Sequence, residues 1–194
     1  ESRGLGDVYK RQGTQSLTGL NNYTGATVIR GGTLAVSSLA NIGQLSSIGR
    51  GDAASAATNA GSLIFDGGTL LYTGNSAKTY DNSRDVNIFL ATQTPSIAID
   101  RLFTLAGNAS IESNGTYGSP VMGRTDNHAA LVFSNFGDIA FLGAGARTLN
   151  LGGNSTGDNQ INLRLVDNPL GGALTVTRAS FGAFWTLGNQ TNAY

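Results

Sequence analysis

Short apolar segments separated by Gly, Asn, Ser and Asp occupy most of the chain after residue 12. Each is about five residues long and partly alternates apolar with polar positions, which is typical of β-strands. The alternation is cleanest in 160–167, where Ile161, Leu163 and Leu165 share one face and the residues between them the other. The pattern predicts an all-β chain with strands in 27–36, 62–72, 85–91, 96–100, 130–134, 138–143, 147–153, 160–167 and 173–178.

The segment 36–49 comes closest to a helical pattern. Its Leu39, Ile42, Leu45 and Ile48 recur every three residues. That spacing leaves two interpretations open, a short helix or a looped-out turn between strands.

A Gly-Gly-Thr-Leu sequence occurs twice, at Gly31–Leu34 and Gly67–Leu70, with an offset of 67 − 31 = 36 residues. An apolar segment flanks each copy on both sides, so each reads as strand, glycine corner, strand. Two glycines between strands can form a hairpin turn. They can also form a corner between two sheets, because glycine tolerates positive φ. Internal similarity favours the second arrangement, a solenoid whose coils bury their apolar faces on their neighbours.

Composition excludes several classes of protein. The 194 residues are enough for one domain with a real core. Only 12% are charged and the net charge is zero, so there is no electrostatic reason to expect nucleic acid as a partner. No cysteine is present, which excludes disulfides and thiol chemistry. No apolar run reaches the roughly 18 residues of a membrane span, so this fragment is not expected to cross a membrane.

Residues 1–12 differ from the rest of the chain. They contain basic residues without the apolar stretch of a secretory signal. Residues 7–12, Asp-Val-Tyr-Lys-Arg-Gln, resemble the translation of a transposase adapter used in sequencing libraries. We therefore treat 1–12 as a non-native, adapter-derived or disordered leader on a metagenomic fragment, and 13–194 as the folded segment, incomplete at both ends.

The segment Gly19–Val36 resembles the autotransporter-associated beta strand repeat, also called the passenger-associated transport repeat. The resemblance rests on Asn-x-Tyr-Thr-Gly, Thr-Val and Gly-Gly-Thr-Leu, although Ala26 stands where the family often has a second glycine. The segments 100–107, 145–161 and 173–189 resemble the stretches that lead into the next repeat. This resemblance implies a right-handed parallel β-helix and no chemistry. The residues assigned to the structural motif are Asn21, Tyr23, Gly25, Gly31, Gly32, Thr33, Leu34, Gly67, Gly68, Thr69 and Leu70.

The final residues, Asn192–Tyr194, match Asn21–Tyr23. We therefore expect the parent gene to continue with Thr-Gly, a short strand and another Gly-Gly-Thr-Leu.

Candidate catalytic residues are sparse. The single histidine, His128, has Asp126 nearby, but no Gly-x-Ser-x-Gly elbow supports a Ser-His-Asp set. Polysaccharide cleavage would need two acidic side chains close together, for example at stacked positions of adjacent coils. The segment 152–160 has one carboxylate and lacks the spaced acids of a calcium loop. We assign no catalytic, cofactor or metal residue. The acids are scattered singly, at Asp66, Asp81, Asp85, Asp100, Glu112, Asp126, Asp138, Asp158 and Asp167.

The family resemblance implies a structural stalk, a passenger segment of a secreted bacterial autotransporter-like surface protein that contributes to export and adhesion. The expected location is the cell surface, reached through the periplasm. Expected partners are neighbouring β-helical coils of the same chain and host or matrix surface ligands. The alternative is a β-helix protein that binds or cleaves polysaccharide. A groove in which acids, or acids with Arg, converge would favour an enzyme.

Overall fold

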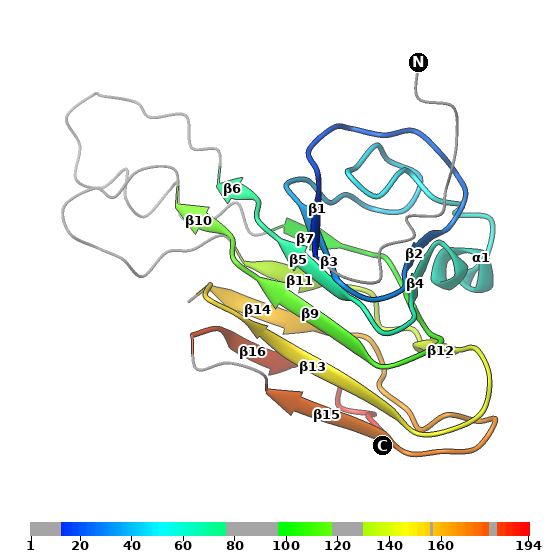
Figure 1. Ribbon diagram of the computed structural model, residues 1–194. Coiled ribbons are helices and arrows are strands. Elements are labelled where there is room, and N and C mark those ends of the chain that lie inside the picture. The colour runs from blue at the N-terminus through cyan, green and yellow to red at the C-terminus, as the bar shows by residue number, and fades with distance from the viewer. Residues whose placement is uncertain (1–12, 77–96, 118–129, 156, 179–181) are drawn as a thin grey trace, which may run out of the picture.

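The chain is all-β with parallel sheets. A computed structural model describes residues 13–76, 97–117, 130–155, 157–178 and 182–194 (Figure 1). Every pairing between named strands in these residues is parallel. The described residues contain one short α-helix, α1 (Ala56–Gly61).

Three sheets hold most of the strands. Sheet 1 contains, in spatial order, β1 (Thr14–Leu17), β3 (Thr33–Val36), β5 (Thr69–Tyr72), β9 (Ala109–Ser113), β13 (Arg147–Gly153) and β15 (Leu174–Arg178). Sheet 2 contains β12 (Ala140–Phe141), β8 (Thr104–Leu105), β4 (Leu63–Phe65) and β2 (Thr27–Ile29). Sheet 3 contains β16 (Phe184–Leu187), β14 (Asp158–Ile161), β11 (Leu131–Phe133) and β7 (Ile97–Ile99). A two-stranded pair joins β6 (Asn75–Ser76) and β10 (Thr116–Tyr117).

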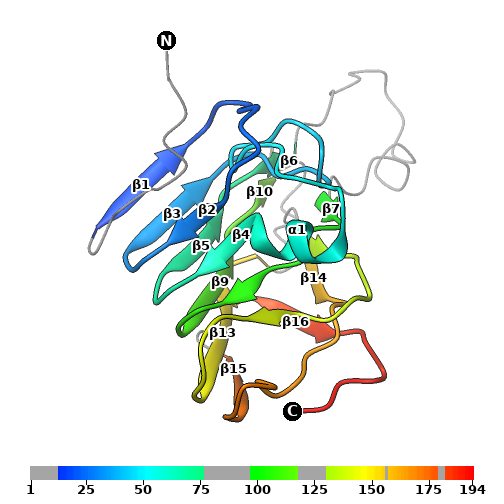
Figure 2. The same cartoon turned by 90° about the vertical axis from the view of Figure 1, so that its right-hand side faces the viewer.

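The chain passes through the sheets in rotation. It runs through β7, β8 and β9, then through β11, β12 and β13, visiting sheets 3, 2 and 1 each time. We call one such passage a circuit. Successive circuits are stacked, with β1 at one end of sheet 1 and β15 at the other (Figure 2). Parallel strands need long connections, and the rest of each circuit supplies them.

Apolar residues stack in rows on the inner faces of the sheets. In sheet 1, Leu34 pairs with Leu70, Leu70 with Ile111, and Ile111 with Leu151, and all four are buried. Three phenylalanines extend the core between sheets 2 and 3. Phe65, Phe103 and Phe133 contact edge to face, with ring centroids 5.5 and 5.7 Å apart. The core therefore lies between the sheets and runs along the stack.

The strands predicted from alternation are present wherever the structure describes them, with the predicted bounds for β13 and shorter bounds for the others. The predicted strand 85–91 lies outside the described residues. The segment 160–167 differs, because β14 ends at Ile161. Ile161, Leu163 and Leu165 are nevertheless all fully buried. The residues after β14 turn a corner toward sheet 2, where Asp138 forms a bridge with Arg164.

The helical interpretation of 36–49 is wrong and the looped-out turn is correct. Leu39 and Ile48 are buried but Leu45 is 47% exposed, so these residues do not form one face. The helix α1 lies further along and was not predicted. Its Ser55 side chain accepts a hydrogen bond from Thr58 N, and Ser55 N donates to Thr58 Oγ1, which forms a capping box. Six residues are too few for a periodic apolar signal.

The Gly-Gly pairs form corners, not hairpins. In both copies the strand before the glycines belongs to sheet 2 and the strand after them to sheet 1. Gly31 and Gly32 have φ of 104° and 65°, and Gly67 has φ of 96°. Gly68 has no positive φ, but a Cβ there would lie 2.3 Å from Ile29 Cγ2. Positive φ explains why glycine is needed at positions 31, 32 and 67, and close packing explains why it is needed at position 68.

Candidate functional site

Asn21, Tyr23 and Gly25 lie in the irregular segment between β1 and β2. Asn21 forms an antiparallel bridge with Ser46, and its Nδ2 donates to Ser47 O at 2.8 Å. Tyr23 Oη lies 2.8 Å from Thr27 Oγ1. Burial raises the pKa of Tyr23, while its hydrogen bond with Thr27 lowers it less strongly. Gly25 is exposed, and its place in the motif has no structural explanation.

The remaining motif residues lie side by side in adjacent strands. Thr33 pairs with Thr69 and Leu34 with Leu70, so the offset of 36 residues seen in the sequence is the register between β3 and β5. Other offsets differ, from 33 − 14 = 19 residues between β1 and β3 to 110 − 69 = 41 between β5 and β9. The sequence repeat thus identifies one strand pair of sheet 1 rather than a constant period.

An uncharged polar row crosses the whole outer face of sheet 1. We call it the hydroxyl row. Asn150 Nδ2 donates to Ser110 Oγ at 3.3 Å, and Thr177 Oγ1 donates to Asn150 Oδ1. Cross-strand pairs of this kind stabilise a sheet. The row consists of Thr14, Thr33, Thr69, Ser110, Asn150 and Thr177.

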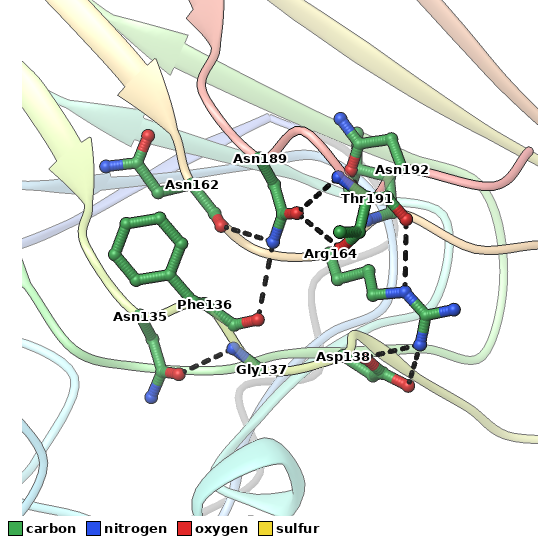
Figure 3. Close-up of polar contacts among 10 residues, drawn as sticks. Asn135, Phe136, Gly137, Asp138, Asn162, Arg164, Asn189, Thr191 and Asn192 are labelled. Carbon is green, nitrogen blue, oxygen red and sulfur yellow. Dashed lines mark hydrogen bonds and ion pairs between the residues drawn. The ribbon is translucent and has the colours of Figure 1, made fainter.

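Asparagine side chains join successive circuits at the corner between sheets 3 and 2 (Figure 3). Asn189 Nδ2 donates to Asn162 O at 3.0 Å and to Phe136 O at 3.3 Å. Its Oδ1 accepts from Thr191 N at 2.9 Å. Asn135 acts similarly, because its Nδ2 donates to Asp100 O at 2.9 Å while its Oδ1 accepts from the amide of residue 137. A short amide side chain satisfies carbonyls that a corner leaves without ladder partners.

Two Asp–Arg pairs also join circuits. Arg164 Nη1 contacts both carboxylate oxygens of Asp138 at 3.2 Å, and its Nε donates to Thr191 O (Figure 3). Arg30 Nε lies 3.5 Å from Asp66 Oδ2. Their side chains are 38–56% exposed, so solvent weakens both pairs.

Arg101 is fully buried and holds the loop 38–50 against the stack. Its Nε donates to Ala40 O at 2.7 Å and its Nη2 to Gly49 O at 2.7 Å. Desolvation lowers the pKa of Arg101, and the nearby charge of Asp100 opposes that effect. Asp100 adds to the attachment, because its Oδ1 accepts from Ile42 N at 2.8 Å. Nothing in the sequence around Arg101 indicates that its guanidinium is buried.

The described residues contain no group of three or more His, Cys, Asp or Glu side chains placed to hold a metal. Asp66 and Asp138 each face an arginine at a separate corner. His128 and Asp126 of the candidate triad lie outside the described residues, as do Asp81, Asp85 and the leader 1–12.

An apolar groove lies at the end of the stack formed by β15 and β16. Its volume is about 300 Å³, and Val176, Phe184, Trp185, Leu187 and Tyr194 are among its lining residues. Trp185 Nε1 donates to Gly152 O at 2.9 Å, which fixes the indole ring. The aspartates paired with arginine do not line this groove.

One comparison relates the chain to a known protein. The Adhesin BmaC autotransporter of Brucella suis biovar 1 (strain 1330) is 34% identical over 186 residues. The match covers 93% of this chain and 4% of the adhesin, so the chain spans a small part of its relative's length. No family model and no solved structure matches the chain. The chain is therefore related to an autotransporter adhesin over nearly its whole length, while the repeat family suggested by the motifs stays a prediction.

The described residues include no helix that is long and apolar enough to span a membrane.

Proposed function

We propose that residues 13–194 form successive coils of a right-handed parallel β-helix, each circuit being one coil. The observation that carries this proposal is the hydroxyl row, which continues without interruption across all six strands of sheet 1. A right-handed path agrees with the strong preference of parallel crossover connections.

The function we propose is mechanical: a stalk segment in the exported passenger of a bacterial cell-surface protein, which holds other parts of that protein away from the cell and contributes to adhesion. Support comes from the relationship to an autotransporter adhesin. The polar contacts at the corners also favour a stalk, because asparagine amides and Asp–Arg pairs connect one coil to the next. Each coil then contacts mainly its neighbours, as in other solenoids.

The test is to display the chain between a cell-surface anchor and a terminal epitope tag, with a flexible linker of equal length as control. A stalk is expected to resist added protease and to hold the tag further from the cell than the linker does. Incubation of the purified chain with a panel of polysaccharides distinguishes the alternative. New sugar ends that disappear with Asp138→Asn would support polysaccharide cleavage and contradict the stalk.

A further inference from the structure

The loop between β3 and β4 contains an Arg-Gly-Asp sequence that the stacking of the coils does not use. Its residues are Arg50, Gly51 and Asp52, so one glycine separates a guanidinium from a carboxylate. Both charged residues are exposed, while Gly51 between them is buried. Neither Arg50 nor Asp52 belongs to an ion pair among the described residues. Both charges are therefore open to an external partner.

Other parts of the described chain flank this loop on both sides along the stack. On one side lies the segment before β2, where Tyr23 O accepts from Arg50 N at 3.0 Å and from Gly51 N at 3.3 Å. On the other side lies the corner after β7, where Asp100 Oδ1 accepts from Ile42 N at 2.8 Å. Further coils beyond either end of the piece would stack on the ends of the sheets and not on this loop.

The backbone of the Arg-Gly-Asp sequence is held at each of its three residues. Tyr23 O accepts from the first two amides, and Asp52 N donates to Ser62 Oγ at 3.1 Å. Gly51 has φ of 66°, and a Cβ there would lie 2.5 Å from Ile42 Cδ1, so the position requires glycine. A backbone that is already ordered loses little conformational entropy when its side chains bind a partner.

The two charged side chains keep most of their binding capacity. Among the described residues, no hydrogen bond or ion pair involves the Arg50 guanidinium. Asp52 Oδ1 accepts from Ala54 N at 2.8 Å, which orients the carboxylate and leaves its other oxygen for a ligand. A guanidinium forms paired hydrogen bonds with carboxylates, and carboxylate oxygens are preferred ligands of Mg²⁺, Ca²⁺ and Mn²⁺. Cα atoms two residues apart are separated by at most about 7 Å, so one site can contact both side chains.

We propose that Arg50–Asp52 is a binding site for a protein receptor that combines an acidic pocket with an incompletely coordinated divalent cation. The acidic pocket pairs with the Arg50 guanidinium, and the Asp52 carboxylate completes the coordination of the cation. The proposal rests on the adhesive role proposed above, and it assigns that role to named residues and a class of partner.

The test measures binding of a purified integrin ectodomain, a receptor that recognises Arg-Gly-Asp peptides, to the immobilised full chain by surface plasmon resonance. Saturable binding is expected in Mn²⁺ buffer, and both EDTA and a soluble Arg-Gly-Asp-Ser peptide are expected to abolish it. Asp52→Glu keeps the charge but moves the carboxylate outward, and Arg50→Ala removes a side chain that forms no hydrogen bond or ion pair among the described residues. Each is expected to weaken binding by roughly tenfold or more, with the thermal unfolding midpoint of Arg50→Ala unchanged. Asp158→Glu, at an exposed position of β14, is the matched control and is expected to bind like the wild type.

Absence of saturable binding, or binding that neither Arg50→Ala nor Asp52→Glu weakens, would overturn the proposal. Binding that persists in EDTA would overturn it as well, because the carboxylate would then not be coordinating a cation. The display experiment described above tests the stalk separately. A displayed chain that resists protease but does not bind the integrin rejects the receptor site and leaves the stalk, whereas an integrin-binding chain that fails as a spacer rejects the stalk and leaves the site.

Discussion

At the scale of single residues, glycine conformation and the burial of polar side chains explain most of the motif. Gly31 and Gly32 adopt positive φ at the turn from sheet 2 to sheet 1. Tyr72 is 1% exposed within the inner face of the same sheet. Substitutions at these positions are expected to change the free energy of unfolding in a defined direction.

Replacing Gly32 with Val is expected to lower the free energy of unfolding by about 1–3 kcal/mol, because a β-branched residue is strained at φ of 65°. Gly31→Val is expected to act in the same direction. Gly25→Val is the control, since Gly25 lacks a positive φ and a Cβ added there would meet open space, with nothing within 4 Å beyond its chain neighbours. Urea unfolding measures all three. Equal stability of the Gly32 and Gly25 variants would contradict the corner geometry.

Alkaline pH is expected to destabilise the protein through Tyr72. Burial raises the pKa of Tyr72 from 10.0 to about 12. Below pH 10 the phenol is neutral in both states, but between pH 10 and 12 it ionises mainly in the unfolded chain. The free energy of unfolding therefore falls across this window, by about 2–3 kcal/mol in total.

Tyr72→Phe removes this contribution, so its stability is expected to depend less steeply on pH above 10. Tyr23, whose pKa burial also raises, stays in the variant and retains part of the slope. Urea unfolding at pH 9 and pH 11 provides the comparison. Identical pH dependence in both proteins would show that Tyr72 ionises as freely in the folded chain as in the unfolded one.

At the scale of elements, the corners absorb the differences in the number of residues between paired strands, so the strands stay in register. Offsets between paired residues in sheet 1 vary from 19 to 41, yet the inner and outer rows continue. Side chains such as Asn189 compensate for the irregular corners by binding carbonyls of two other segments. The hydrogen bonds of the Asn189 side chain are better shielded from solvent than the Asp–Arg pairs, because Asn189 is only 8% exposed.

Asn189→Ala is expected to cost about 1–3 kcal/mol, since it removes the donor that two part-buried backbone carbonyls share. Asp138→Asn breaks an exposed ion pair at the same corner and is expected to cost about 0–1 kcal/mol. Gln190→Ala, at an exposed neighbouring position, is the control. Thermal unfolding measures the three variants. A larger loss for Asp138→Asn than for Asn189→Ala would reverse the ranking of these contacts.

Alternation of apolar residues predicted most strands, and the repeated Gly-Gly-Thr-Leu favoured a solenoid without specifying which strands pair. Alternation did not predict β1, β6, β8, β9, β10 or β16, which are short or contain few strongly apolar residues. Contacts between segments far apart in the sequence could not be predicted, because no local sequence pattern marks them. Arg101 looks like an ordinary surface arginine in the sequence, and its acceptors lie up to 61 residues away.

At the scale of the whole molecule, one arrangement accounts for the parallel sheets, the continuous rows and the low charge. Coils stacked along one axis need uncharged side chains at equivalent positions, because like charges in adjacent strands repel. The relationship to an autotransporter adhesin then gives the stack its proposed place in a surface stalk. The central claim is therefore the register between successive coils.

Cysteine pairs on the hydroxyl row test that register most directly, because the chain has no cysteine of its own. Thr33 and Thr69 lie in paired positions of adjacent strands, where Cα atoms are about 4.8 Å apart and within disulfide range. Thr33 and Ser110 are two strands apart, about 9.6 Å and beyond that range. Mild oxidation is expected to cross-link the Thr33→Cys/Thr69→Cys protein and to leave Thr33→Cys/Ser110→Cys reduced. Equal cross-linking of both pairs, or of neither, would contradict the stacked coils.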